Sequence, residues 1–140
     1  MNLLPNEPTG LTFESPRIEA EWRGHSLDTL ARLMVVQAAA FAASTLDWTF
    51  HFTCIYRTRD EDMALGGSGV HSAWRAADVR TKDRPPSDVV NLAAHVNGLW
   101  AYDLSRPRLL ACYTAEHGTG PHAHFQVHPA TTPRLSVRAA

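Results

Sequence analysis

The spacing of apolar and polar residues along the chain predicts two helices. Residues 27 to about 43 carry apolar side chains at helical spacing in an Ala-rich segment, and Ser26 precedes them as a candidate N-cap. We expect this helix to pack against a sheet. A second helix is predicted from residue 88 to about residue 97, with Ser87 as its N-cap and Gly98 near its end.

Two strands are predicted in the middle of the chain. Residues 48–57 are aromatic and β-branched, and alternation puts Phe50, Phe52 and Cys54 on one face of that strand. Residues 76–80 are short and largely apolar, which favours a second strand.

Two further alternating segments predict a β-hairpin near the end of the chain. Residues 109–116 and 122–128 both alternate, and residues 117–121 between them are rich in Gly and Pro. The second segment has one apolar face for the core. Its other face, which would line an opening, consists of His122, His124, Gln126 and His128.

These elements together predict an α+β fold in which helices flank a small antiparallel sheet. The length of 140 residues is typical of one domain, so we expect residues 1–140 to form a single unit. Residues 1–20 are rich in Pro, Asn, Glu and Gly with little periodicity, and are expected to form an extended arm.

Composition narrows the classes of partner. Hydrophobic residues make up 44% and charged residues 19% of the chain, and the formal net charge is −1. This balance argues against a nucleic acid or an anionic membrane held by bulk electrostatics. We expect no membrane span and no secretory signal, and hence a protein that is cytoplasmic when made. The two cysteines, Cys54 and Cys112, lie in apolar runs without metal-ligand spacing and are expected to be buried thiols.

Histidine and aspartate supply the candidate chemistry. A catalytic zinc ion usually takes three protein ligands and a water molecule. His71 and Asp78 lie seven residues apart, and a carboxylate inside an apolar strand is costly unless it is paired or bound to a metal. His122 and His124 share one strand face, and His128 is about 13 Å from His124 along the strand, too far to share the ion.

These motifs carry a resemblance to a known group of enzymes. HSAWRAAD at 71–78, followed by EHGTGPHAHFQV at 116–127, resembles the zinc D-Ala-D-Ala carboxypeptidases, D-Ala-D-Ala dipeptidases and L-alanyl-D-glutamate endopeptidases. It also resembles the amino-terminal signalling domain of hedgehog proteins, which shares their fold. The similarity covers roughly residues 50–128. It implies the hedgehog/DD-peptidase fold, one Zn²⁺ held by His71, Asp78 and His124, and hydrolysis of peptide bonds in peptidoglycan.

The resemblance also implies roles for other residues. Glu116 is expected to be the general base, although it stands eight residues before His124 and similar enzymes place an acid two to six residues before. In the predicted hairpin Glu116 would lie opposite His122; His117 and His122 are alternative proton carriers. Arg57 is expected to stabilise the oxyanion or bind substrate. Supporting or substrate-binding roles are expected for His122, Arg75 and Ser68.

Three functions follow as hypotheses. The first is a zinc peptidase of the carboxypeptidase or endolysin type, with a peptidoglycan peptide as substrate and a phage gene as one setting. The second is a non-catalytic zinc-binding module of the hedgehog type. A metal-dependent nuclease is disfavoured because no helix-borne ligand is visible and the net charge does not suit a polyanion.

Overall fold

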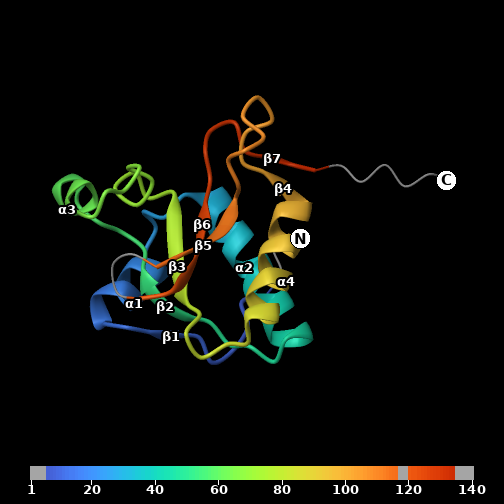
Figure 1. The fold of residues 1–140 in the computed structure, drawn as a ribbon. Helices are drawn as coiled ribbons and strands as arrows, with labels where there is room; N and C mark the ends of the chain where they lie inside the picture. The colour runs from blue at the N-terminus through green and yellow to red at the C-terminus, as the bar shows by residue number, and fades with distance from the viewer. Residues whose placement is uncertain (1–5, 117–119, 135–140) are drawn as a thin grey trace.

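The computed structural model describes residues 6–116 and 120–134, and its centre is a mostly antiparallel sheet (Figure 1). The strand order is β1-β2-β3-β6-β5, and only the β1–β2 pair is parallel. A second sheet pairs β4 with β7. The bounds are Thr12–Phe13 for β1, His51–Cys54 for β2, Ala76–Arg80 for β3, Trp100–Ala101 for β4, Cys112–Ala115 for β5, His122–Gln126 for β6 and Thr132–Pro133 for β7. The predicted mixture of helices with a small antiparallel sheet is therefore confirmed.

Two long helices lie side by side against one face of this sheet (Figure 1). Helix α2, Thr29–Thr45, contacts β3 and β6, and α4, Pro86–Leu99, contacts β5. Their predicted caps are wrong. Asp28, not Ser26, caps α2, because its carboxylate accepts hydrogen bonds from the first-turn amides. Helix α4 starts at Pro86, so Ser87 lies inside the helix.

The first 20 residues are not simply an extended arm. Strand β1 adds to the sheet edge beside β2, and α1 runs over Pro16–Arg23. Ser15 caps α1 by accepting a hydrogen bond from the amide of Ile18, and Pro16 suits the first helical position. Trp22 anchors this helix, since its buried ring stacks on Phe52 at 4.7 Å between centroids. Packing, rather than periodicity, thus orders the segment.

The core lies between the sheet and the helices. Phe50, Phe52 and Phe125 are fully buried and contact one another through their rings. Helix α2 contributes small side chains and Met34 to the same cluster. The remaining described helix, α3, covers Arg59–Ala64 and is closed at its start by a reciprocal cap between Thr58 and Glu61. Among the described residues, no helix combines the length and apolar character that a membrane span requires.

Candidate metal centre

A row of four side chains crosses the sheet on the face turned away from α2 and α4. The strand register pairs Cys54 with Asp78, Asp78 with His124, and His124 with Tyr113. Directly paired residues share a face, and their Cβ atoms lie about 4.5–5.5 Å apart. The adjacent row, which includes Phe125, points into the core instead. The pleat of the sheet therefore gathers a thiol, a carboxylate, an imidazole and a phenol on one surface.

A register irregularity in β2 brings Cys54 into this row. Phe52 pairs with Val79, but Cys54 pairs with Asp78 instead of the residue two positions along β3. Such a bulge inserts one residue and turns the following side chain to the opposite face. Cys54 therefore leaves the apolar face of Phe52, and Ile55 is buried in the core. Cys54 was expected to be a buried thiol without metal-ligand spacing in the sequence, and the bulge instead brings it close to His71 and Asp78.

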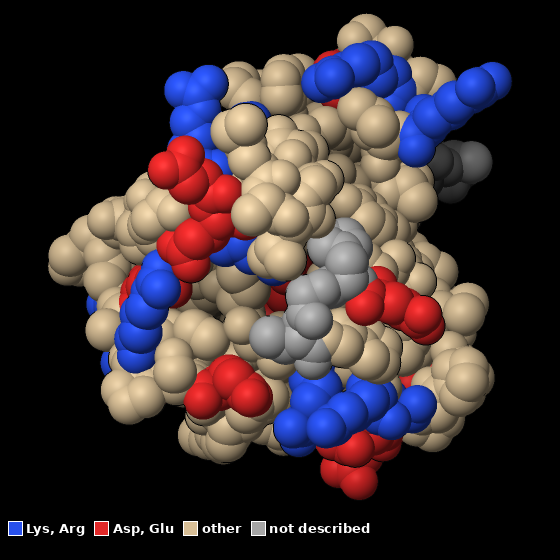
Figure 2. All heavy atoms as spheres, turned by 60° about the vertical axis from the view of Figure 1, so that its left-hand side comes forward, with Lys and Arg blue, Asp and Glu red and all other residues tan. Residues whose placement is uncertain are grey.

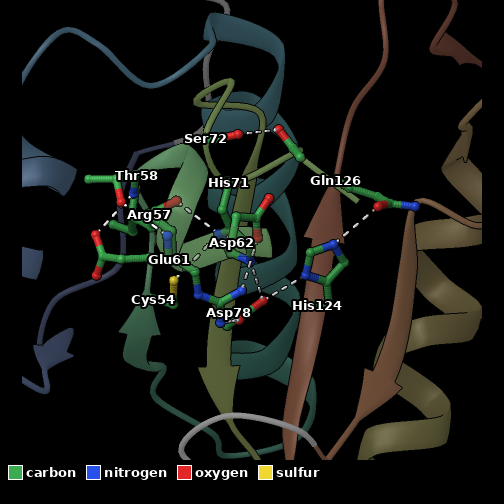
Figure 3. Close-up of polar contacts among 12 residues, drawn as sticks. Cys54, Arg57, Thr58, Glu61, Asp62, His71, Ser72, Asp78, His124 and Gln126 are labelled. Carbon is green, nitrogen blue, oxygen red and sulfur yellow. Dashed lines mark hydrogen bonds and ion pairs between the residues drawn. The ribbon is translucent and has the colours of Figure 1, made fainter. Parts of the chain in front are cut away.

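His71 reaches the same surface from the turn that precedes β3 (Figure 3). Its Nδ1 lies 2.9 Å from the carbonyl oxygen of Ile55 and 3.5 Å from Sγ of Cys54. A carbonyl oxygen only accepts, so Nδ1 carries a proton and donates it. This leaves Nε2 pointing at Oδ1 of Asp78 at 3.3 Å, buried and without a hydrogen-bond partner. An unprotonated ring nitrogen and a carboxylate oxygen both carry lone pairs and repel each other. A cation between them, either a second proton on the ring or a metal ion, removes this repulsion.

The charged forms of His71 and Asp78 stabilise each other strongly. Burial alone would lower the pKa of His71, but hydrogen bonds and charge from Asp78 and Cys54 outweigh it and raise the pKa to about 10. Burial alone would raise the pKa of Asp78, yet hydrogen bonds and charge from His124 and His71 keep it well below its usual range. Without a metal, the site is therefore a buried ion pair whose shared proton a cation can replace.

Two histidines of β6 complete the surroundings of Asp78. Nδ1 of His124 lies 2.7 Å from Oδ1 of Asp78, and its Nε2 lies 3.1 Å from Oε1 of Gln126. The amide nitrogen of Gln126 donates to the carbonyl of Leu110, which orients its oxygen toward His124. His122 donates from Nδ1 to the carbonyl of Gly120 and directs Nε2 to Oδ2 of Asp78 at 3.4 Å. The carboxylate thus lies at the centre of three imidazoles.

The donor set could hold a metal ion. Cys54, His71 and Asp78 offer ligand atoms that all lie within 4.8 Å of one another. Sulfur, imidazole nitrogen and carboxylate oxygen are the ligands that zinc takes in proteins, and a proton-donating Nδ1 is the usual support for a ligating Nε2. Two of the three predicted ligands are in this group. Nδ1 of His124 is hydrogen-bonded to the same carboxylate at 2.7 Å. This distance is shorter than the separation of about 3.3 Å between two ligand atoms of a tetrahedral zinc ion.

A small cavity lies against these residues. It has a volume of about 120 Å³, and its lining includes His71, His124, Tyr113, Arg57 and Asp62. Arg57 reaches both carboxylates, with Nη1 3.5 Å from Oδ1 of Asp62 and Nη2 3.6 Å from Oδ2 of Asp78. The predicted position of Arg57 beside the ligands is therefore found.

Asp62 is a residue that the sequence pattern did not single out. It belongs to α3 and is only 2% exposed, and its Oδ2 is buried without a hydrogen-bond partner. Gly67 makes room for it, because a Cβ atom there would lie 2.1 Å from Oδ1 of Asp62. A buried, unsatisfied carboxylate oxygen in a polar cavity is costly unless it serves a ligand or a reaction.

The structure does not place Glu116 where the predicted hairpin would put it. Ala115, not Glu116, pairs with His122, so the expected hairpin register is wrong by one residue. Glu116 lies just past the end of β5, is exposed, and makes no hydrogen bond or ion pair with any other described residue. A shift of one residue reverses the face of every side chain, which explains why Tyr113 occupies the row instead. His117 lies outside the described residues.

Tyr113 and the remaining candidates surround the centre. The Tyr113 ring lies 4.9 Å from that of His124, and burial raises the pKa of its phenol. Ser68 is exposed and lines the small cavity, while Arg75 lines a larger neighbouring one. Strand alternation from the correct register could have found Tyr113, whereas Asp62 left no signal in the sequence pattern.

Comparison with protein families, curated proteins and solved structures finds no match for this chain. The geometry of the site and the sequence motifs are therefore the observations that bear on a function.

Proposed function

We propose that this chain is a zinc-dependent peptidase that hydrolyses peptide bonds of bacterial peptidoglycan. One observation carries the proposal: His71 and His124 come from separate segments and converge on Asp78, with ring nitrogens 3.3 Å and 2.7 Å from its Oδ1. Asp78 is 2% exposed, and the imidazoles of His71 and His124 are buried as well, so the whole polar cluster lies inside the protein. A cavity lies beside them with an arginine and an unpaired carboxylate oxygen.

His71, Asp78 and His124 would hold the ion, with Cys54 within reach. Bound zinc would supply Lewis acidity, which lowers the pKa of water toward about 7 and polarises a carbonyl group. The Nδ1–H of His71 donates to a backbone carbonyl and keeps Nε2 directed at the site. His124 is oriented in the same way by Gln126.

Asp62 takes the role that the motif suggested for Glu116. Asp62 lines the same cavity as His71 and His124, and its Oδ2 has no hydrogen-bond partner, so it can accept a proton from the attacking water. The water oxygen then bonds to the peptide carbonyl carbon. When the C–N bond breaks, Asp62 returns the proton to the leaving amine, and a carboxylic acid and an amine are released.

Arg57 stabilises the negative charge of the carbonyl oxygen. Its side chain is 12% exposed and already balances two carboxylates, which fixes its guanidinium at the cavity wall. A preorganised donor aimed at developing charge contributes about 3–4 kcal/mol in measured cases. Arg57 therefore both orients Asp62 and serves the transition state.

The substrate class follows from the motif resemblance, not from the cavity alone. HSAWRAAD and HAHFQV support the hedgehog/DD-peptidase fold, and with it a carboxypeptidase or endolysin activity on cell-wall peptides. A phage lysis or virion protein is the setting that we propose. Charges of both signs are interspersed over one face and reach into a hollow near its centre (Figure 2). This mixture does not favour a polyanion as substrate.

The test compares four purified proteins: wild type, Asp62→Asn, Glu116→Gln and His71→Ala. Metal content is measured by plasma mass spectrometry, and peptides released from purified peptidoglycan are measured by mass spectrometry. We expect one zinc per chain in all but His71→Ala. Hydrolysis should fall by about 10²–10⁴-fold in Asp62→Asn and stay unchanged in Glu116→Gln. A wild-type protein without stoichiometric metal refutes the site, and loss of activity in Glu116→Gln restores that residue as the base.

A second candidate function is a non-catalytic zinc-binding interaction module. The observation in its favour is Cys54, whose thiolate would add a fourth protein ligand to His71, Asp78 and His124. Four protein ligands make a closed site of the structural kind. Stoichiometric zinc without hydrolysis of any peptidoglycan preparation, together with loss of folded protein on chelation, would favour this module over the peptidase.

A further inference from the structure

A hydroxyl, an imidazole and a carboxylate form a second polar cluster at the β1 edge of the sheet. Strands β1 and β2 pair in parallel, with Thr12 opposite His51. Phe13 and Phe52 stack on the core side, at 5.4 Å between their ring centroids. Alternation then turns Thr12, Glu14 and His51 to the outer face of the sheet. Two neighbouring strands therefore build this cluster, and it includes none of the candidate metal ligands.

The two ring nitrogens of His51 have different partners. Nε2 lies 2.6 Å from Oε2 of Glu14, and Nδ1 lies 2.8 Å from Oγ1 of Thr12. An ionised carboxylate only accepts hydrogen bonds, so the proton of the neutral ring is on Nε2. Nδ1 is then unprotonated and accepts the hydroxyl proton of Thr12. A hydroxyl nucleophile activated by a histidine that a carboxylate orients has the same order of contacts, here with the roles of the two ring nitrogens exchanged.

The charge and the exposure of the cluster suit this chemistry. The hydrogen bond from His51 lowers the pKa of Glu14, and the charges of Arg80 and Lys82 act in the same direction. Glu14 is therefore ionised at neutral pH and keeps the ring in the tautomer that can take a proton from the hydroxyl. The side chain of His51 is 20% exposed and Thr12 is exposed, so a small molecule can reach both.

A cavity of about 400 Å³ lies beside the hydroxyl and the carboxylate, since both Thr12 and Glu14 line it. The rest of its lining combines apolar side chains with a hydroxyl and a second acid: Leu11, Phe13, Ser15, Pro16 and Glu19. Two carboxylates disfavour an anionic ligand. The apolar side chains suit a small uncharged group, such as the acyl part of an ester.

The backbone supplies a hydrogen-bond donor next to the hydroxyl. The amides of Thr12 and Glu14 donate to carbonyls of β2, those of Phe50 and Phe52. The amide of Phe13, which lies between them, therefore points away from β2 and toward the open edge of the sheet. Because it directly follows Thr12 in the chain, it can donate to the oxygen of a carbonyl group that this hydroxyl attacks.

We propose that Thr12 is a nucleophile that accepts an acyl group from small uncharged esters, with His51 as its base and Glu14 as the residue that orients His51. The Thr12 oxygen bonds to the ester carbonyl carbon while its proton passes to Nδ1 of His51. The bond between that carbon and the leaving alcohol breaks, and the alcohol takes the proton from His51. Water then hydrolyses the acyl ester, which releases a carboxylic acid and restores Thr12. The reaction needs no metal ion and is independent of the proposed peptidase function.

The experiment uses p-nitrophenyl acetate as the ester and full-length protein kept in chelator, so that a bound metal ion contributes nothing. Absorbance follows the release of p-nitrophenolate, and mass spectrometry locates the acetyl group in the chain. The variants are Thr12→Val, Thr12→Ser, His51→Gln and Glu14→Gln. The controls are Thr114→Val, which removes an exposed threonine from β5 of the same sheet, and His25→Gln, which removes an exposed histidine. Circular dichroism checks that each variant is folded.

We expect one acetyl group on residue 12 in wild type, in Thr12→Ser and in both controls, and none there in Thr12→Val. The rate of acetylation should fall by about 10²-fold or more in His51→Gln, as for removal of a general base, and by at least about tenfold in Glu14→Gln. Acetylation of Thr12 that is no faster than that of Thr114 overturns the proposal. An unchanged rate in folded His51→Gln also overturns it, because the cluster would then only fix β1 to the sheet.

Discussion

Asp78→Asn is the perturbation that tests the site most directly. The carboxylate is 2% exposed and contacts His124 at 2.7 Å, His71 at 3.3 Å and Arg57 at 3.6 Å. Asparagine keeps the shape but removes the charge. The histidines can then lose a proton, whereas Arg57 stays charged and keeps only Asp62, at 3.5 Å.

The expected cost follows from this arrangement. Removing one partner of a buried ion pair costs about 3–5 kcal/mol. Because Asp62 still balances Arg57, we expect the lower end, about 3 kcal/mol in the free energy of unfolding. For a chain of this size the midpoint temperature should fall by about 10 °C, at about 3 °C per kcal/mol. The control Asp83→Asn removes an exposed carboxylate paired with Arg80 and should change stability by less than about 0.5 kcal/mol.

Thermal melts with chelator and with zinc are the assay for Asp78→Asn. Zinc at about 100 times its dissociation constant stabilises a folded protein by about 2.7 kcal/mol, so wild type and the Asp83→Asn control should gain about 8 °C. Asp78→Asn should gain almost nothing. Two results refute the reasoning: a variant that melts with wild type in chelator, or one that gains the full shift with zinc.

The remaining predictions concern pH, the thiols and a glycine. In metal-free protein the pKa of His71 is raised from 6.5 to about 10, so protonated His71 stabilises the fold fully below pH 6.5 and this contribution is lost as pH rises toward 10. Urea melts should therefore show the free energy of unfolding of wild type falling over that range. A His71→Gln variant whose free energy of unfolding falls equally with pH contradicts this. The second candidate function, with Cys54 as fourth ligand, predicts a thiolate-to-cobalt charge-transfer band in cobalt-loaded wild type and Cys112→Ser that Cys54→Ser lacks. An unchanged band in Cys54→Ser, or no band in wild type, removes that thiol from the site. Gly67→Ala would place Cβ 2.1 Å from Oδ1 of Asp62. The variant should lose about 1–3 kcal/mol in free energy of unfolding and at least tenfold in the rate of hydrolysis, and it should keep its zinc. Full activity would show that Asp62 need not be held in this position.

The amino-acid sequence alone determines most of the elements around the site. Helical spacing predicted α2 and α4, and a short apolar run predicted β3 with the bounds that the structure has. The same alternation put His122, His124 and Gln126 on one face of β6, opposite a core face that contains Phe125. These patterns are local: each follows from the period of a helix or strand and the burial of one side. The resemblance of the motifs also singled out His71, Asp78 and Arg57, which the structure brings together.

Only the tertiary structure decided which other groups meet them. A bulge between Phe52 and Cys54 turns the thiol toward Asp78. A one-residue difference in the hairpin register puts Ala115, not Glu116, opposite His122 and Tyr113 opposite His124. Alternation within a single strand cannot reveal either, because register is set by the pairing between strands, and one residue of offset reverses the face. Asp62 enters through the packing of α3 and the turn at Gly67. The sequence therefore determined the candidate His71 and Asp78, and only the pairing of strands and the packing of α3 decided which side chains surround them.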